Sequence, residues 1–269
     1  MAQQVILSIQ SAVMHGAVGN DAAMPVYQHL KQPAERLDTV RLAAHPGFGT
    51  RAVSVTPPDE LNGLLTDYRH LAIFQNLAAV QTGYFGQPSQ IDPVARFITE
   101  SQAAHSQLVY LLDPVLGDGG RLYVDKAISE MMRDRLLPLA DIITPNQFEL
   151  GLLADTAITG ETDAIAAARS LLGGRLQTVF VTGVPTTAGQ IADIMVRAET
   201  EMLIPADKQA SGVSGSGDVL SAFFLSAVVS GLPLTQAAEM ASNRTAQILR
   251  RAETQLTMPV LASVWEELV

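Results

Sequence analysis

The stretch SGVSGSGDVLSAFFLSAVVSG, residues 211–231, places two glycines and an aspartate directly before a strongly apolar run. Gly215 and Gly217 flank Ser216, and Asp218 stands at the front of the run, which predicts a buried helix over 218–230. Glycine lets a backbone adopt positive φ and approach a ligand closely, and the free N–H groups of a helix start point back into such a turn. The stretch therefore predicts an anion site at a helix N-terminus.

The carboxylate of Asp218 needs its own explanation, because a negative charge repels a bound phosphate. It fits the site if it accepts a proton from a hydroxyl group that attacks the phosphate. The alternative is helix capping, since aspartate is favoured in the first turn of any helix. The four residues alone leave both interpretations open.

Composition limits the class of protein. The chain has 269 residues, of which 48% are hydrophobic and 16% charged, a globular profile long enough for one large domain over 1–269. The net charge of -10 makes a nucleic-acid partner a poor fit. The absence of cysteine excludes disulfides and thiolate sites and fits a cytoplasmic enzyme.

Targeting and membrane signals are also missing from the sequence. The first residues lack the basic segment of a secretory signal. The longest apolar run, 219–229, is much shorter than the ~20 residues of a membrane span. No membrane partner is expected.

Short apolar segments alternate with amphipathic ones along the chain, which predicts an α/β protein with a mostly parallel sheet covered by helices on both faces. Ligands bind beyond the carboxyl ends of such strands, so the residues that close them matter most. These closing residues are Ser11, Gly83, Asp113, Thr144 and Thr182. The predicted strands are 5–9, 38–44, 77–83, 108–113, 141–144, 177–183 and a pair over 190–205; the predicted helices are 57–68, 88–105, 123–137, 147–153, 161–172, 218–230, 235–253 and 259–268.

Two further motifs place carboxylates at the same sheet edge. In DPVLGDGG, residues 113–120, Asp113 closes a strand and Asp118 follows in a glycine-rich loop. Carboxylates, water and phosphate oxygens are the ligands of Mg²⁺, but this motif alone favours an Asp-Pro turn as the explanation of Asp113. In TPNQFE, residues 144–149, Asn146 and Glu149 have the spacing of a capping box.

Several well-known motifs are absent. The sequence has no GxxxxGK[ST] phosphate loop, no GxGxxG after a strand, no HExxH and no GxSxG. The five histidines are scattered, which does not suggest a metal cluster.

Taken together, these segments resemble the ribokinase-like superfamily and, within it, the pyridoxal kinases. SIQSAVMHGAVGNDAA (8–23) resembles the start of a pyridoxal kinase, and TGYFG (82–86) resembles the segment after the third strand. DPVLGDGGRLYV (113–124) and LADIITPNQFE (139–149) resemble the nucleotide-side motifs, and GSGD (215–218) resembles the superfamily's anion hole. SIQS together with ITPNQFE is more specific than GSGD alone.

The resemblance implies ATP-dependent phosphorylation of the hydroxymethyl group of pyridoxal, and of pyridoxine or pyridoxamine, by a homodimer. It implies that Asp218 is the base and that the backbone around Gly215, Ser216 and Gly217 stabilises the transferring phosphoryl group. It implies Mg²⁺ held by Asp113 and Glu149 through water. The other implied contacts are Ser11, Val18, His45, Pro46 and Tyr84 for the pyridine, and Asp118, Thr144, Asn146, Thr182, Leu203, Ile204, Pro205 and Ala206 for the nucleotide.

One segment departs from the family pattern. Pyridoxal kinases often have Ser-Asn-His-Thr after the second strand, whereas this chain has AAHPGFG at 43–49, so that His45 is kept and Pro46 replaces the threonine. The alternatives are a hydroxymethylpyrimidine kinase, which usually has an N-terminal glycine-rich signature that is missing here, a sugar or nucleoside kinase, and a non-catalytic ligand-binding protein of the same fold. Asp113, Glu149 and Asp218 together argue against the last of these.

Overall fold

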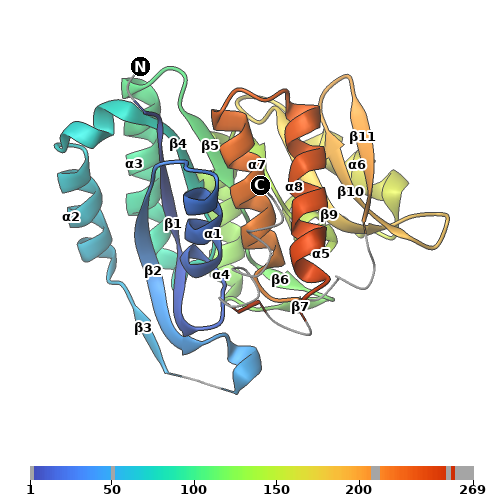
Figure 1. The fold of residues 1–269 in the computed structure, drawn as a ribbon, viewed down its shortest axis with the longest axis horizontal. Helices are drawn as coiled ribbons and strands as arrows, with labels where there is room; N and C mark the ends of the chain where they lie inside the picture. Colours follow the sequence, from blue (N-terminus) through green and yellow to red (C-terminus); the bar gives the residue numbers. More distant parts are fainter. Residues whose placement is uncertain (1–2, 50–51, 207–212, 253–255, 258–269) are drawn as a thin grey trace.

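The structure is a computed structural model that describes residues 3–49, 52–206, 213–252 and 256–257. Its centre is a nine-stranded sheet with the order β11-β10-β9-β8-β5-β4-β1-β2-β3 (Figure 1). The strands from β9 to β2 run parallel, whereas β3, β10 and β11 pair antiparallel to their neighbours. The prediction of a mostly parallel α/β sheet is therefore confirmed.

The strands of the sheet have these bounds: β1 (Val5–His15), β2 (Ala34–Ala44), β3 (Val53–Val55), β4 (Leu77–Thr82), β5 (Val109–Leu112), β8 (Ile142–Ile143), β9 (Thr178–Pro185), β10 (Ile191–Val196) and β11 (Glu201–Ala206). A separate two-stranded hairpin consists of β6 (Gly117–Asp118) and β7 (Arg121–Leu122). Short helical turns are η1 (Pro46–Phe48), η2 (Ala72–Asn76), η3 (Pro88–Gln90), η4 (Met132–Leu136) and η5 (Leu137–Leu139).

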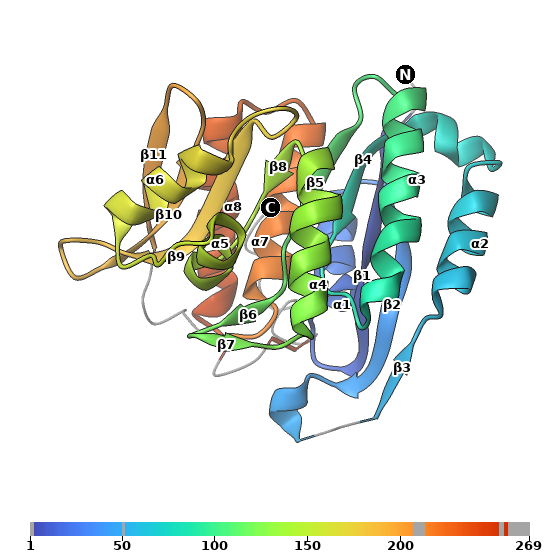
Figure 2. The ribbon, with the colours of Figure 1, turned by 180° about the vertical axis from the view of Figure 1, so that it is seen from behind.

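Helices cover both faces of the sheet, as predicted. One face carries α1 (Asn20–His29), α7 (Ser216–Val229) and α8 (Leu234–Leu249). The other carries α2 (Pro58–Tyr68), α3 (Ile91–Ala104), α4 (Lys126–Met131), α5 (Gln147–Ala154) and α6 (Glu161–Leu171), seen in front in Figure 2. Strand residues alternate between the two cores: Ile6 packs under α1 and α7, while Leu7 and Ile9 face the opposite helices.

The sequence prediction differs from the structure in several elements. Helix α1 was not predicted, because Pro25 lies inside it and Gly19, with φ 55, begins it. The predicted helix 123–137 contains only the short α4, followed by the turns η4 and η5, where Pro138 interrupts regular helical hydrogen bonding. The hairpin β6-β7 and strand β3 were also not predicted. The predicted helix 259–268 lies outside the described residues.

Candidate active site

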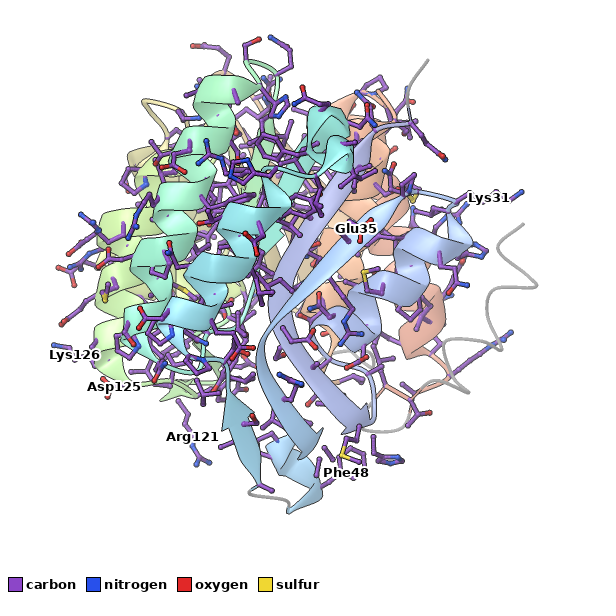
Figure 3. All side chains as sticks on the ribbon, turned by 90° about the vertical axis from the view of Figure 1, so that its left-hand side faces the viewer. Lys31, Glu35, Phe48, Arg121, Asp125 and Lys126 are labelled. Carbon is purple, nitrogen blue, oxygen red and sulfur yellow. The ribbon has the colours of Figure 1, made fainter. Side chains whose placement is uncertain are left out.

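A cleft of about 1410 Å³ opens at the carboxyl ends of the parallel strands. A pocket for one small ligand is typically about 300–1,000 Å³, so this cleft has room for two ligands side by side. The cleft is lined by Pro46 of the turn η1 and Arg121 of the β6-β7 hairpin. Figure 3, a side view onto β2 and β3, shows these two elements, marked by Phe48 and Arg121, near the same end of the molecule. The cleft therefore lies between elements that project beyond the sheet.

Most residues predicted for the site line this one cleft. They are Ser11, Val18, His45, Pro46, Tyr84, Asp113, Asp118, Thr144, Asn146, Glu149, Thr182, Ala206, Gly215, Ser216, Gly217 and Asp218. Leu203, Ile204 and Pro205 are not among its lining residues. The side chain of Ile204 packs in the core beneath α7 and α8, and Leu203 and Pro205, its neighbours on the edge strand β11, are exposed. The loop 207–212 lies outside the described residues.

Ser11 was predicted to follow a strand, but in the structure it lies inside β1. Gln10 pairs with Asp38 and Ala12 pairs with Arg41, so two residues of β2, Thr39 and Val40, stand opposite the single residue Ser11. The bulge is therefore in β2, directly opposite Ser11. Bulges near functional sites often redirect a side chain. Ser11 is buried and lines the cleft beside this bulge.

The turn before α7 requires glycine at its first position. Gly215 begins the helix with φ 92, in the left-handed region. A Cβ at this position would lie 2.1 Å from the carbonyl oxygen of Ala17, so that no side chain fits. The Ser216 N–H donates to the Val213 carbonyl, whereas the N–H groups of Gly217 and Asp218 have no acceptor within the described part of the chain. Gly217 and Asp218 thus offer the donors of an anion site.

Asp218 is the third residue of α7, and no capping box forms between its side chain and the N-cap residue Gly215 in the described part of the chain. Instead the Asp218 side chain accepts a hydrogen bond from the Gly19 N–H at the start of α1. Burial raises the pKa of Asp218 to about 6, and the Gly19 bond opposes that increase because it favours the charged form. The capping alternative is therefore a poorer fit than a carboxylate directed toward the cleft.

Asp113 is held by a hydroxyl chain that the sequence analysis did not identify. The Ser221 hydroxyl donates to Oδ2 of Asp113 at 2.8 Å. The oxygen of Ser221 lies 2.9 Å from the hydroxyl of Thr144, which must then be the donor. Ser221 is fully buried and lies three residues after Asp218. A polar residue within this apolar run is the sequence feature that could have identified Ser221 as part of the site.

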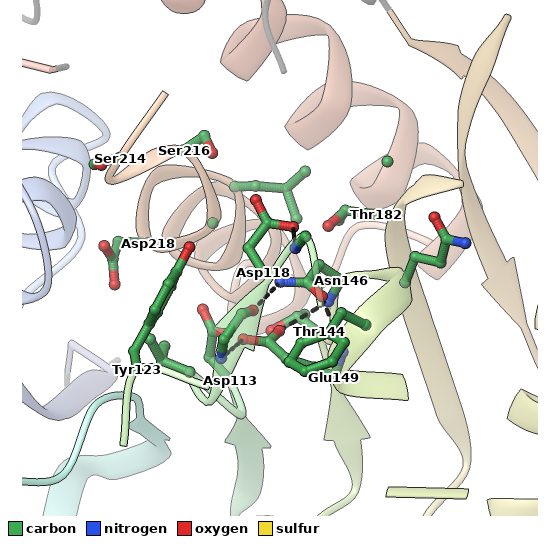
Figure 4. Close-up of a pocket in the computed structure, with 18 of the residues that line it drawn as sticks. Asp113, Asp118, Tyr123, Thr144, Asn146, Glu149, Thr182, Ser214, Ser216 and Asp218 are labelled. Carbon is green, nitrogen blue, oxygen red and sulfur yellow. Dashed lines mark hydrogen bonds between the residues drawn. The ribbon is translucent and has the colours of Figure 1, made fainter. Parts of the chain in front are cut away.

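Glu149 forms the predicted capping box with Asn146. Asn146 Oδ1 accepts from the Glu149 N–H, and Glu149 Oε2 accepts from the Asn146 N–H, both at 2.9 Å. Its other oxygen, Oε1, accepts from the N–H groups of Leu116 at 2.9 Å and Gly117 at 3.3 Å. Glu149 therefore also fixes the loop that carries Asp118 (Figure 4).

Asp113, Glu149 and Asp218 form a concentration of negative charge. Burial raises the pKa of Glu149 to about 8, despite its three backbone hydrogen bonds. Burial, and then the charges of Asp218 and Glu149, raise the pKa of Asp113 well above its ordinary value. Figure 4 shows Asp113 beside Glu149, with Asp218 to one side and Thr182 to the other. Such a group is stabilised by a cation bound beside it.

The described residues contain no group of three or more His, Cys, Asp or Glu side chains arranged to hold a metal ion by themselves. Mg²⁺ does not need such a group when a nucleotide carries it, since it then keeps several waters and uses one or two carboxylates together with phosphates. In the described part of the chain, no helix is long and apolar enough to cross a membrane.

Comparison with known proteins places this cleft in a family. A family model described as phosphomethylpyrimidine kinase matches residues 61–260. A pyridoxine/pyridoxal/pyridoxamine kinase of Bordetella bronchiseptica is 32% identical over 91% of this chain and 88% of its own length. The pyridoxal kinase PdxY of Rubrobacter xylanophilus is 32% identical over 91% of this chain and 87% of its own.

A solved structure agrees with these matches. Pyridoxal kinase from Leishmania donovani, in complex with ADP and pyridoxamine, superimposes with a TM-score of 0.86 at 25% identity and covers 99% of this chain and 96% of its own. The fold and the glycine-lined cleft define a kinase of the ribokinase-like superfamily. Within that superfamily, the chain belongs to the pyridoxal kinase family.

Proposed function

We propose that this protein transfers the γ-phosphoryl group of ATP to the hydroxymethyl oxygen of pyridoxal, giving pyridoxal 5′-phosphate and ADP, and that it also accepts pyridoxine and pyridoxamine. The observation that carries the proposal is the Asp218 carboxylate, held by the Gly19 N–H beside two N–H groups that lack an acceptor in the described chain. Two relatives with pyridoxal kinase names match over 91% of the chain, which supports the choice of acceptor.

Asp218 accepts the proton of the hydroxymethyl group while the hydroxymethyl oxygen forms the new bond to phosphorus. The bond between phosphorus and the leaving oxygen of ADP then breaks. The N–H groups of Gly217 and Asp218, with the backbone around Gly215 and Ser216, stabilise the charge of the transferring group. The pyridine ring is held by Ser11, Val18, His45, Pro46 and Tyr84. The nucleotide is bound along Asp118, Thr144, Asn146, Thr182 and Ala206.

Mg²⁺ fits the donor set of the cleft. The pKa values of Asp113, Glu149 and Asp218 are all raised, mainly by desolvation, and the charges of Asp218 and Glu149 add to the increase at Asp113. This arrangement favours a cation among the three carboxylates. Ser221 engages Oδ2 of Asp113, so Oδ1 remains for a water on the ion, whereas Glu149 already accepts three backbone hydrogen bonds. We assign Asp113 the larger part in holding Mg²⁺ through water and Glu149 the smaller part. The ion, when bound, neutralises charge on the phosphates.

The substrate assignment is tested with a panel of acceptors. We expect ATP–Mg²⁺ and pyridoxal each to raise the melting temperature, and ADP release to require both. Hydroxymethylpyrimidine is the second candidate, favoured by the description of the family model that matches residues 61–260. Faster ADP release with hydroxymethylpyrimidine than with pyridoxal would replace the proposal, ribose as the best acceptor would point to a sugar kinase, and binding without ADP release would indicate a non-catalytic protein.

Pro46 provides a prediction about substrate affinity. It opens the turn η1 on the cleft wall and offers neither an N–H nor a hydroxyl to the pyridine. A hydrogen bond to a neutral group contributes about 0.5–1.5 kcal/mol, so Pro46→Thr should lower the KM for pyridoxal a few-fold. Pro46→Ala is the matched control, because it removes the ring without adding a hydroxyl. An equal change in both variants, or none in either, would mean that other residues hold the ring.

We further propose that residues 1–269 act as a single kinase domain in the cytoplasm and associate as a homodimer. The large exposed apolar side chains Met14, Phe48 and Val53, on and beside the first three strands, are suited to an interface. Light scattering at micromolar concentration should give twice the chain mass of 28.6 kDa. A mass equal to one chain at that concentration would contradict the homodimer.

A further inference from the structure

A buried carboxylate outside all the motifs faces the same cleft. Asp193 lies on β10, is only 7% exposed and lines the cleft. Its Oδ1 accepts a hydrogen bond from the Gly183 N–H at 3.0 Å, and its Oδ2 accepts one from the Ser242 hydroxyl on α8. Asp193 therefore connects the end of β9 to α8, the helix that packs against β10 and β11.

The bond to Gly183 occurs at an irregularity in the sheet. Val181 pairs with Ile194 and Val184 pairs with Ala192, so two residues, Thr182 and Gly183, stand opposite the single residue Asp193. This is a β-bulge, and Gly183 has the positive φ of 68 that such a position favours. The bulge interrupts the regular hydrogen bonds between β9 and β10, and the Gly183 N–H donates to the Asp193 carboxylate instead.

The bulge begins directly at Thr182, the residue that faces the cleft at the end of β9. Val181 and Val184 both pack in the core beneath α5 and α6, although they are three residues apart, because the bulge adds one residue between them. Thr182 faces the cleft, and its N–H donates to the Pro145 carbonyl at 2.9 Å. Loss of the Asp193 bond would allow this segment to move toward a regular strand.

The bond to Ser242 holds the part of α8 that lines the cleft. Thr245, three residues further along α8, also lines the cleft and is 4% exposed. Its hydroxyl has no partner among the residues that the structure describes, so it is available to a ligand. By fixing Ser242, Asp193 sets the position of this helix face relative to β9.

We propose that Asp193 is a positioning residue for the phosphate donor: it fixes Thr182 and the Ser242–Thr245 face of α8 where the nucleotide binds, without touching the reacting atoms. The inference rests on the proposed kinase function. The acceptor alcohol must lie beside Asp218, and Thr182 lies on the other side of Asp113 and Glu149 (Figure 4), which leaves its end of the cleft to the nucleotide.

Asp193→Ala removes both hydrogen bonds. Loss of hydrogen bonds to a charged group should raise the KM for ATP and weaken ADP binding in calorimetry by about tenfold. The KM for pyridoxal should stay within about twofold, since Ser11 and Pro46 are not attached to β10. Asp193→Asn keeps an oxygen for the Gly183 N–H and should restore ADP binding to within a few-fold of the parent. Ser242→Ala, which removes only the α8 contact, serves if Asp193→Ala does not fold.

Asp141→Ala is the matched control. Asp141 is also a carboxylate, and it accepts a hydrogen bond from the Tyr110 N–H at 2.8 Å. It precedes β8, at the amino-terminal end of the strand, whereas the cleft lies at the carboxyl ends. This variant should lower the melting temperature and leave the ratio of the two KM values unchanged. If Asp193→Ala behaves like Asp141→Ala, or raises both KM values in parallel, Asp193 is a structural residue only. The calorimetric test needs no acceptor, so it remains decisive even if the parent protein fails to phosphorylate pyridoxal.

Discussion

An Asp218→Asn variant should lose at least about 10²-fold in kcat, the usual contribution of a general base, while its melting temperature and its ATP affinity change little. Asparagine has the same size, and its side-chain oxygen can still accept the hydrogen bond from the Gly19 N–H. It cannot take a proton from the attacking hydroxyl group. The measurement is kcat with saturating ATP and pyridoxal, together with a thermal melt.

The two interpretations of Asp218 predict opposite outcomes for this variant. Asparagine and aspartate cap helices about equally well, so a capping role predicts a nearly unchanged enzyme. Ser216→Ala is a useful control on the same helix turn, since the Ser216 N–H is already bonded to Val213 and the hydroxyl has no assigned role in proton transfer. Near-normal kcat in Asp218→Asn would make this aspartate an ordinary residue of the first helical turn.

The sheet could be predicted because its strands are unusually apolar. Segments such as those around Leu111 and Val181 are buried on both faces, so they appear in the sequence as short continuous apolar runs. The boundaries were less accurate where backbone geometry overrides composition. Strand β1 continues to His15 past Ser11, opposite a bulge in β2, although Ser11 looked like the residue that closes a shorter strand.

Helix α1 shows why one element could not be predicted. Gly19 and Pro25 are both unfavourable to a helix, but tertiary contacts compensate: Tyr27 is fully buried and donates to Gln81 on β4. The helix matters for the site, because the N–H of its N-cap residue Gly19 interacts with Asp218. The functional role of Gly19 therefore has no local signal in the sequence and depends on a contact between segments about 200 residues apart.

The carboxylates of the cleft could be predicted, but their partners could not. Asp113, Glu149 and Asp218 follow strands or begin helices, so topology alone brings them to one edge. Ser221 and Asp193 lie inside regular elements among apolar neighbours, where a polar residue has many explanations. Only the packing of α7 against β5, and of α8 against β10, shows that their hydrogen bonds reach the cleft.

Asp113→Ala should raise the Mg²⁺ concentration needed for half-maximal activity by about 10–100-fold, the usual cost of losing a group that orients a metal ligand. Pyridoxal binding should change much less, because the pyridine contacts proposed for Ser11 and Pro46 lie on β1 and η1. Activity is measured against Mg²⁺ concentration at fixed ATP, and pyridoxal binding is measured separately without nucleotide.

The melting temperature of the same variant distinguishes a role toward the cation from the role of an Asp-Pro turn. Asp113 is buried beside two other carboxylates that raise its pKa, so removing its charge relieves a repulsion. This gain opposes the loss of the hydrogen bond from Ser221. Asp113→Asn can keep that bond, and we expect it to melt no lower than the parent while needing as much Mg²⁺ as Asp113→Ala. If both variants melt much lower and keep the parent's Mg²⁺ dependence, Asp113 acts only in the turn, and the charge of the cleft must be balanced through Glu149.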